Sequence, residues 1–219
     1  MIEDDLGMFH SFFPATIFGW VFVLVLATLL GFASWIDFRK MIVPKWVTVS
    51  CAALGVILNI IRGAWLGSEG QVTWLFNAPG PLTGALDGLL FSLAGFAVGF
   101  VVFFALWILG VCGGGDVKLV AAVGAWLGPR YILGAVIFSF PVVILLICLT
   151  YVAAFIGYDM APKGPIPVKG MGSMKPRRRL LTFSLPLTVA TLFLLLLGFR
   201  FELALAVPPP PPQVAATGG

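Results

Sequence analysis

Residues 88–127 read GLLFSLAGFAVGFVVFFALWILGVCGGGDVKLVAAVGAWL, and this stretch decides the fold class. Its apolar run from 88 to 111 is long enough to cross a bilayer as a helix, since about 20 residues suffice. A glycine-rich break with one aspartate, Asp116, follows, and a shorter apolar run covers 117–127. The stretch therefore predicts membrane helices with an ionisable residue between them.

The rest of the chain has the same character. Of its 219 residues, 60% are hydrophobic and only 10% are charged, whereas a soluble domain carries roughly 25% charged residues. We predict an all-α polytopic membrane protein with about six transmembrane helices, over residues 17–36, 46–61, 88–111, 117–127, 132–156 and 180–199. Its expected parts are a short N-terminal segment (1–16), one membrane domain (17–207) and a proline-rich unstructured tail (208–219). Residues 1–14 are expected to be unstructured as well.

The basic residues predict the orientation of these helices. Loops on one side hold ten of the 13 lysines and arginines, namely Arg39, Lys40, Lys45, Lys118, Lys163, Lys169, Lys175 and Arg177–Arg179. Loops on the other side hold three, Arg62, Arg130 and Arg200. Because cytoplasmic loops are enriched in lysine and arginine, the first side is expected to be cytoplasmic. Both termini are then non-cytoplasmic.

This orientation brings two aspartates to one membrane surface. Asp37 ends the first apolar run, and Asp116 begins the fourth, two crossings later. Residues 116–128 would form a helix of roughly 20 Å, against a hydrocarbon core of roughly 30 Å. Asp116 would then lie below the membrane surface, where an ionisable residue is costly and usually functional. The preceding glycines would let a backbone approach closely there.

Structural roles could also explain these residues. Asp116 could cap the helix that follows it, because aspartate is favoured at that position. Asp37 could pair locally with Arg39 or Lys40. Lys45 and Lys118 are expected to serve mainly as markers of the cytoplasmic side.

The remaining polar chemistry is sparse. The three cysteines, Cys51, Cys112 and Cys148, form no C-x-x-C pair, which argues against a zinc site or a disulfide framework. Cys112 beside the glycines is a weak candidate nucleophile. The single histidine, His10, offers no base for a serine or cysteine nucleophile. We therefore expect no metal and no cofactor.

The residues around both aspartates resemble a known family. Gly113-x-Gly115-Asp116-Val117-Lys118-Leu119 is similar to the G-x-G-D signature of the type IV prepilin peptidases. Residues 36–46, which hold Asp37 and Pro44, resemble the segment around that family's first catalytic aspartate, and Phe183–Leu187 resembles a further motif. The resemblance implies that Asp37 and Asp116 are catalytic. Gly113, Gly114, Gly115, Lys118 and Pro44 would shape the loop or bind substrate.

The resemblance also implies an activity. The chain would be an aspartic endopeptidase of the bacterial inner membrane that removes the short basic leader from prepilins at the cytoplasmic face. It resembles the short, peptidase-only form, because it has no N-terminal region with paired cysteines for N-methylation. Its partners would be a prepilin with a hydrophobic helix and membrane lipids, with no nucleic acid; the sequence carries no signal for an oligomeric state. The alternatives are another GxGD-type aspartyl protease, a proton or ion transporter, and a non-catalytic scaffold.

Overall fold

The computed structural model of the chain describes residues 12–40, 44–71, 74–75, 80–110, 112–155 and 183–205. Within these ranges the regular structure is helical and no strand occurs. The helices are α1 (Thr16–Lys40), α2 (Lys45–Ser68), α3 (Pro81–Ile108), α4 (Gly114–Phe155) and α5 (Ser184–Gly198). The predicted all-α class is confirmed.

Four of these helices have the length and composition of membrane spans. They contain the apolar stretches Thr16–Asp37, Lys45–Ser68, Pro81–Ile108 and Gly114–Leu149, and α5 is a shorter apolar helix. Only 22–39% of the most apolar window in each span is buried inside the protein, so most of these apolar surfaces face outward. An outward apolar surface of this extent belongs in lipid. The chain is therefore a multi-pass membrane protein; the number of crossings stays a prediction.

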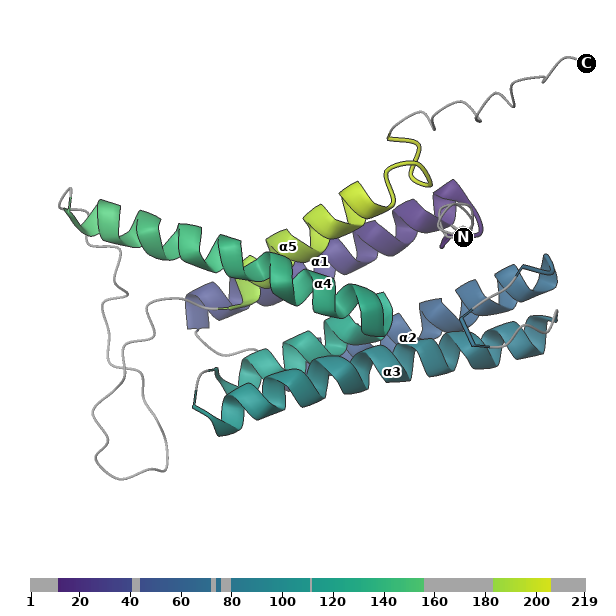
Figure 1. Cartoon of the computed structure of the whole chain (residues 1–219), viewed down its shortest axis with the longest axis horizontal. Helices are drawn as coiled ribbons and strands as arrows, with labels where there is room; N and C mark the ends of the chain where they lie inside the picture. Colours follow the sequence, from purple (N-terminus) through teal and green to yellow (C-terminus); the bar gives the residue numbers. More distant parts are fainter. Residues whose placement is uncertain are drawn as a thin grey trace, which may run out of the picture.

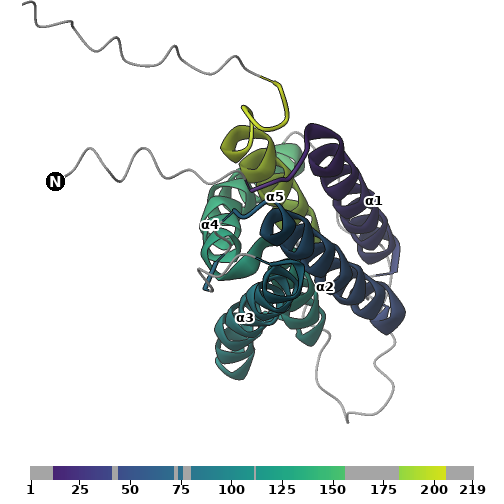
Figure 2. The same ribbon diagram turned by 90° about the vertical axis from the view of Figure 1, so that its right-hand side faces the viewer.

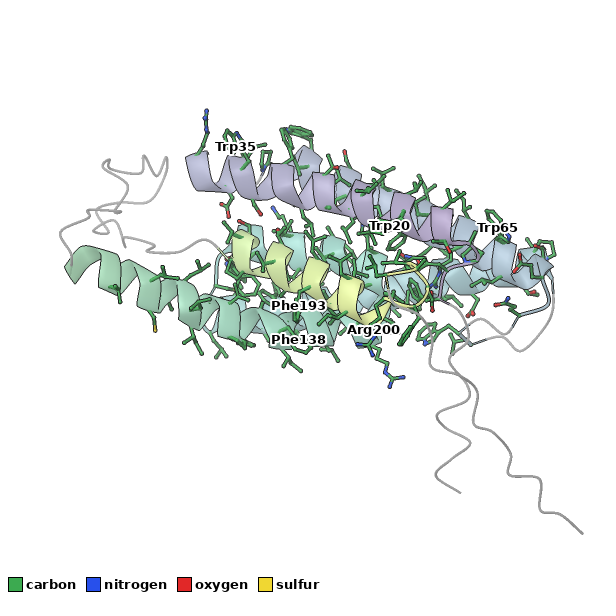
Figure 3. The ribbon with its side chains drawn as sticks, turned by 90° about the horizontal axis from the view of Figure 1, so that it is seen from above. Trp20, Trp35, Trp65, Phe138, Phe193 and Arg200 are labelled. Atoms are coloured by element: carbon green, nitrogen blue, oxygen red, sulfur yellow. The ribbon has the colours of Figure 1, made fainter. Side chains whose placement is uncertain are left out.

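Exposed tryptophans lie toward both ends of the helices. Trp35 and Trp46 are exposed where α1 ends and α2 begins, whereas Trp65 is exposed near the end of α2. Figure 3 shows Trp35 near one end of α1, and Trp20 and Trp65 toward the other end of the bundle. Tryptophan is enriched at the two interfaces of a bilayer, so this distribution fits helices that cross one.

The helices form a closed bundle. Seen end-on in Figure 2, they follow one another in the order α1, α5, α4, α3, α2, and each contacts its two neighbours in that order. Helix α2 also contacts α4 across the bundle. Residues 119–128 of α4 are all buried, so the beginning of α4 is the central element of the fold.

A break divides α4 into two arms. Gly128 has φ 74° and ψ 176°, which is not helical, and Pro129 follows it. Glycine tolerates this conformation, and proline cannot continue a helical hydrogen-bond ladder. Figure 1 shows the helix changing direction sharply, so that residues 129–155 run back toward the end from which residues 114–127 came. The two apolar runs predicted over 117–127 and 132–156 correspond to these two arms.

Two neighbouring helices satisfy the backbone at this break. The carbonyl of Ala125 would normally accept from the N–H of residue 129, which is a proline and has none. Asn59 Nδ2 on α2 donates to the carbonyls of Ala125 and Trp126 at 2.8 and 3.1 Å, and Ser92 Oγ on α3 donates to Ala125 at 2.5 Å. Asn59 and Ser92 are completely buried, so these bonds replace the missing helical one where no solvent reaches.

Glycines set the spacing between α2 and α3. Residues 63–84 look like a Gly/Pro-rich connection, but α2 continues to Ser68 and α3 already begins at Pro81. A Cβ atom added at Gly63 would lie 2.1 Å from the Gly84 carbonyl oxygen, and one added at Gly84 would lie 2.0 Å from the Gly63 oxygen. These glycines therefore allow the two backbones to touch, and composition alone misplaced the helix ends by several residues.

One end of the bundle gathers around Arg62, and we call it the Arg62 end. The Arg62 guanidinium is buried between two aromatic rings, 4.0 Å from the centroid of Phe12 and 4.5 Å from that of Phe91. Phe12 also packs against Tyr131, at 5.8 Å, and Phe199, at 4.6 Å. Tyr131 follows Arg130 in the chain, and Phe199 precedes Arg200. The segments that carry the three arginines predicted on this side therefore meet at the Arg62 end.

Two acidic side chains hold irregular segments at the Arg62 end. Glu202 accepts hydrogen bonds from the backbone N–H groups of Phe12 and Phe13, both at 2.8 Å. Phe13 is buried, so the last part of the N-terminal segment is packed and not unstructured as expected; residues 1–11 lie outside the described ranges. Asp87, which is completely buried, accepts from the backbone N–H groups of Trp74 and Leu75.

Candidate active site

Asp37 lies in the last turn of α1, where the sequence predicted a functional carboxylate. It is buried, with 5% of its surface exposed. Its Oδ2 accepts a hydrogen bond of 2.6 Å from Ser184 Oγ at the start of α5. A buried carboxylate needs such donors, because burial alone disfavours the charged form. Its neighbour Arg39 is exposed and lies 4.4 Å from the centroid of the Trp35 ring.

Asp116 lies in the first turn of α4 and is half-buried. Its Oδ2 accepts a hydrogen bond of 2.9 Å from the backbone N–H of Gly113, while its own N–H donates to the Gly113 carbonyl. Asp116 is therefore the third residue of α4. The capping alternative required it to be the residue that precedes the helix. Its side chain reaches back over the turn to the amide of the residue before the helix, as in a capping box, so Asp116 also stabilises the start of α4.

A cluster of contacts brings the surroundings of the two aspartates together. The rings of Phe183 and Phe103 lie 5.0 Å apart, so the residue before Ser184 packs on the last part of α3. Cys112 Sγ donates to the Phe103 carbonyl at 3.4 Å, which ties the glycine-rich connection to the same place. Figure 1 shows the end of α1 and the beginnings of α4 and α5 at one end of the bundle. We call this the Asp37 end.

The glycine-rich loop is more regular than expected. Gly114 and Gly115 already belong to α4, and only Gly113, which is buried, precedes the helix. The glycine with a left-handed backbone is Gly110, at φ 73°, where α3 ends. A Cβ atom added at Gly114 would meet Trp107 Nε1 at 3.7 Å, an ordinary contact. Steric crowding among the described residues therefore does not explain the glycine at 114.

The other predicted site residues lie nearby. Pro44 precedes α2 with φ −64° and ψ 140°, and its carbonyl accepts from the N–H groups of Val47 and Thr48. This proline therefore starts the helix that follows the Asp37 segment. Lys118, in the first turns of α4, is exposed.

Ser184 is the residue that sequence reasoning overlooked. It appears in the Phe183–Leu187 motif, but nothing in that motif indicates a contact with a residue 147 positions away. Among the described residues, no group of three or more histidines, cysteines or acids lies close enough to hold a metal ion. Within the part of the chain that the structure describes, the Asp37 end supplies the two carboxylates, the Ser184 hydroxyl, the Cys112 thiol and backbone amides.

Comparison with known proteins supplies the last observation. A protein-family model described as the type IV leader peptidase family matches residues 24–155, which is more than half of the chain. The match includes both aspartates, the glycine-rich loop and the break in α4. No curated protein and no solved structure matches the chain.

Proposed function

Because the chain belongs to the type IV leader peptidase family, we propose that it is an aspartic endopeptidase that removes the leader peptide from type IV prepilins or prepilin-like proteins. Membership of the family makes it a membrane protease. The catalytic type, the substrate and the residues that act are our proposal. The observation that supports it is that the last turn of α1, which carries Asp37, and the first turn of α4, which carries Asp116, lie at the same end of the bundle.

Two neighbouring carboxylates can hydrolyse a peptide bond together. Like charges close together cannot both form easily, so one carboxyl keeps its proton while the other stays anionic. The anionic group takes a proton from a water molecule that attacks the scissile carbonyl. The protonated group donates to the carbonyl oxygen and later to the leaving amine. Asp37 and Asp116 are the candidates for these two roles.

The other predicted residues at the Asp37 end support binding of a peptide. Gly113, Gly114 and Gly115 offer backbone without side chains beside Asp116, which suits an extended substrate segment. Lys118 is exposed on the same helix, and Pro44 fixes the start of the helix that follows Asp37. We assign these residues to loop shape and substrate contact.

The basic residues support the orientation. The sequence pattern predicts ten of the 13 lysines and arginines on the side of Asp37 and Asp116, which we assign to the cytoplasm. The bundle would cross the membrane about six times, with each arm of α4 counted as one crossing and both termini outside. A bacterial inner membrane is the location that this orientation and the family favour.

The substrate would be a prepilin whose apolar helix lies in the bilayer beside the enzyme. Its basic leader would leave the membrane at the cytoplasmic face, so that the junction reaches the depth of the two aspartates. Lysines and arginines between residues 163 and 179 have the same charge as such a leader, and anionic lipid is their more suitable partner.

Co-expression with prepilins tests this function. The parent chain should convert the precursor to a shorter form, and mass spectrometry of the product should place the new N-terminus at the junction of leader and apolar helix. Asp37→Asn and Asp116→Asn, both nearly isosteric, should leave the precursor intact while present in the membrane at the parent's level. Cleavage of unrelated signal peptides without cleavage of any prepilin would instead indicate another aspartyl membrane protease.

A further inference from the structure

We propose that Ser184 is a positioning residue that holds Asp37 as the anionic, water-activating member of the aspartate pair. The inference rests on the proposed function and assigns the two roles that it leaves open. Ser184 is completely buried, and its hydroxyl donates to Asp37 Oδ2 at 2.6 Å. A hydroxyl that donates to a carboxylate forms a charge-assisted hydrogen bond, which is stronger than one between neutral groups and so favours the anionic form of Asp37.

The bond to Asp116 is of a different kind. Asp116 accepts the backbone N–H of Gly113 at 2.9 Å, an ordinary length for an amide donor. That amide favours the charged form as well, but Asp116 is only half-buried, so its protonation state depends less on this one donor. Asp37 is the more buried of the two, and its charge therefore depends more on a donor such as the Ser184 hydroxyl.

A second hydroxyl contact keeps Ser184 opposite Asp37. Thr188, one turn further along α5, donates its single hydroxyl proton to the Ser184 carbonyl at 2.8 Å. Ser34, one turn before Asp37 on α1, lies 2.9 Å from Thr188 Oγ1. Because the Thr188 proton is already used, Ser34 must be the donor in this contact. The two helices are thus fixed in register by side chains that do not touch the carboxylate.

The charged groups of the described residues at the Asp37 end are the same in the variants that test this inference. Helix α1 contributes Arg39 and α2 contributes Lys45, and both are exposed. Helix α4 contributes Asp116 and the exposed Lys118. Helix α5 carries no titratable side chain between Ser184 and Gly198. A change that appears only when the Ser184 hydroxyl is removed therefore belongs to that hydroxyl.

The test compares Ser184→Ala with Ser34→Ala. For both variants and the parent, kcat and KM for cleavage of a purified prepilin are measured from low to high pH in detergent. Ser184→Ala should lower kcat about 10- to 100-fold, the value of one hydrogen bond to a charged group. KM should stay nearly unchanged. The acid limb of the profile should move to higher pH, because Asp37 then needs a higher pH to lose its proton.

Ser34→Ala is the matched control. It removes a hydroxyl from the same α1–α5 contact but none from Asp37, so its acid limb should coincide with that of the parent. An unchanged kcat and profile in Ser184→Ala would overturn the inference, and so would a shift confined to the alkaline limb, which would make Asp37 the proton donor. Loss of activity in Asp37→Asn and Asp116→Asn does not depend on this result, so the proposed function is tested separately.

Discussion

The Arg62 end and the Asp37 end of the bundle both bury carboxylates, but they bond them to different parts of the protein. At the Arg62 end, Asp87 and Glu202 each accept two backbone N–H groups from irregular segments. At the Asp37 end, a side-chain hydroxyl from another helix donates to Asp37. Carboxylates of the first kind hold loops in place, whereas the bond from Ser184 joins Asp37 to a neighbouring helix. The bonding partner thus distinguishes Asp37 from the two acids of the Arg62 end. Asp116 accepts a backbone N–H from Gly113, and what sets it apart is its half-buried place at the same end of the bundle as Asp37.

The largest effect on stability should come from removing the cation of the Arg62 end. Arg62→Leu keeps apolar contact with Phe12 and Phe91 but leaves the negative charges of Asp87 and Glu202 without a nearby buried cation. We expect a loss of roughly 3 kcal/mol, the scale for breaking a buried charge arrangement. Thermal unfolding in detergent measures this loss.

The comparison predicts that Arg62→Leu spares the chemistry. The cleavage rate per folded molecule should stay close to that of the parent, because the Asp37 end is intact. Arg200→Leu is the control: Arg200 is exposed and lies 4.7 Å from the Phe201 ring centroid, so its removal should change the unfolding temperature little. If Arg62→Leu abolished cleavage by folded enzyme, the two ends would not be separable.

A smaller loss of stability should follow from a substitution at the break in α4, which lies between the two ends of the bundle. Asn59→Leu removes the donor to the Ala125 and Trp126 carbonyls at the break in α4. An unsatisfied buried carbonyl costs about 1–3 kcal/mol. Because the short arm of α4 carries Asp116, cleavage per folded molecule should fall as well, unlike in Arg62→Leu.

Ser92→Ala is the matched variant for this position. It removes only one of the two side-chain donors to Ala125, and Asn59 still serves that carbonyl. Its stability and cleavage rate, measured in the same unfolding and activity assays, should lie between those of the parent and Asn59→Leu. An equal loss in both variants would contradict the account of the break.

The smallest effect on stability should come from the ionisation of Glu202 as the pH changes. Burial raises the pKa of Glu202 above its ordinary value of 4.5, while the N–H groups of Phe12 and Phe13 and the charge of Arg62 act in the opposite direction. A folded-state pKa above the unfolded one means that Glu202 contributes most stability below pH 4.5 and loses it as the pH rises through the folded-state pKa.

Glu202→Gln should therefore flatten this part of the dependence of unfolding temperature on pH. The variant cannot ionise, and we expect a change of less than about 1 kcal/mol, because Glu202 is only half-buried. A pH dependence identical to that of the parent would show that Glu202 does not titrate in this window.

Much of the fold follows from hydrophobicity and charge. Long apolar runs predict helices, and the alternation of crossings predicts that Asp37 and Asp116 share one side. The exact ends of α2 and α3 cannot be predicted from hydrophobicity and charge. Gly63 and Gly84 look like loop residues in the sequence, but in the structure they are the points where the two helices touch. Their meaning depends on the neighbouring backbone, which local composition does not contain.

The contacts that hold each end were harder to predict. Arg62 fits the pattern of a residue that marks the outer side of a membrane, so its place between two aromatic rings could not be inferred. Ser184 and Asp37 meet only because α1 and α5 are adjacent, although their residues are far apart in sequence. A single sequence carries no signal for such a pair.

The most direct test of the account compares three conservative variants, Asp37→Asn, Asp116→Asn and Asp87→Asn, in one cleavage assay with purified enzyme. The account predicts that the first two lose cleavage by about 100-fold or more, the scale of general acid–base catalysis. Asp87→Asn should keep the parent's rate per folded molecule, although it unfolds at a lower temperature. Cleavage at the parent's rate by either Asp37→Asn or Asp116→Asn would contradict the assignment of the catalytic pair to the Asp37 end.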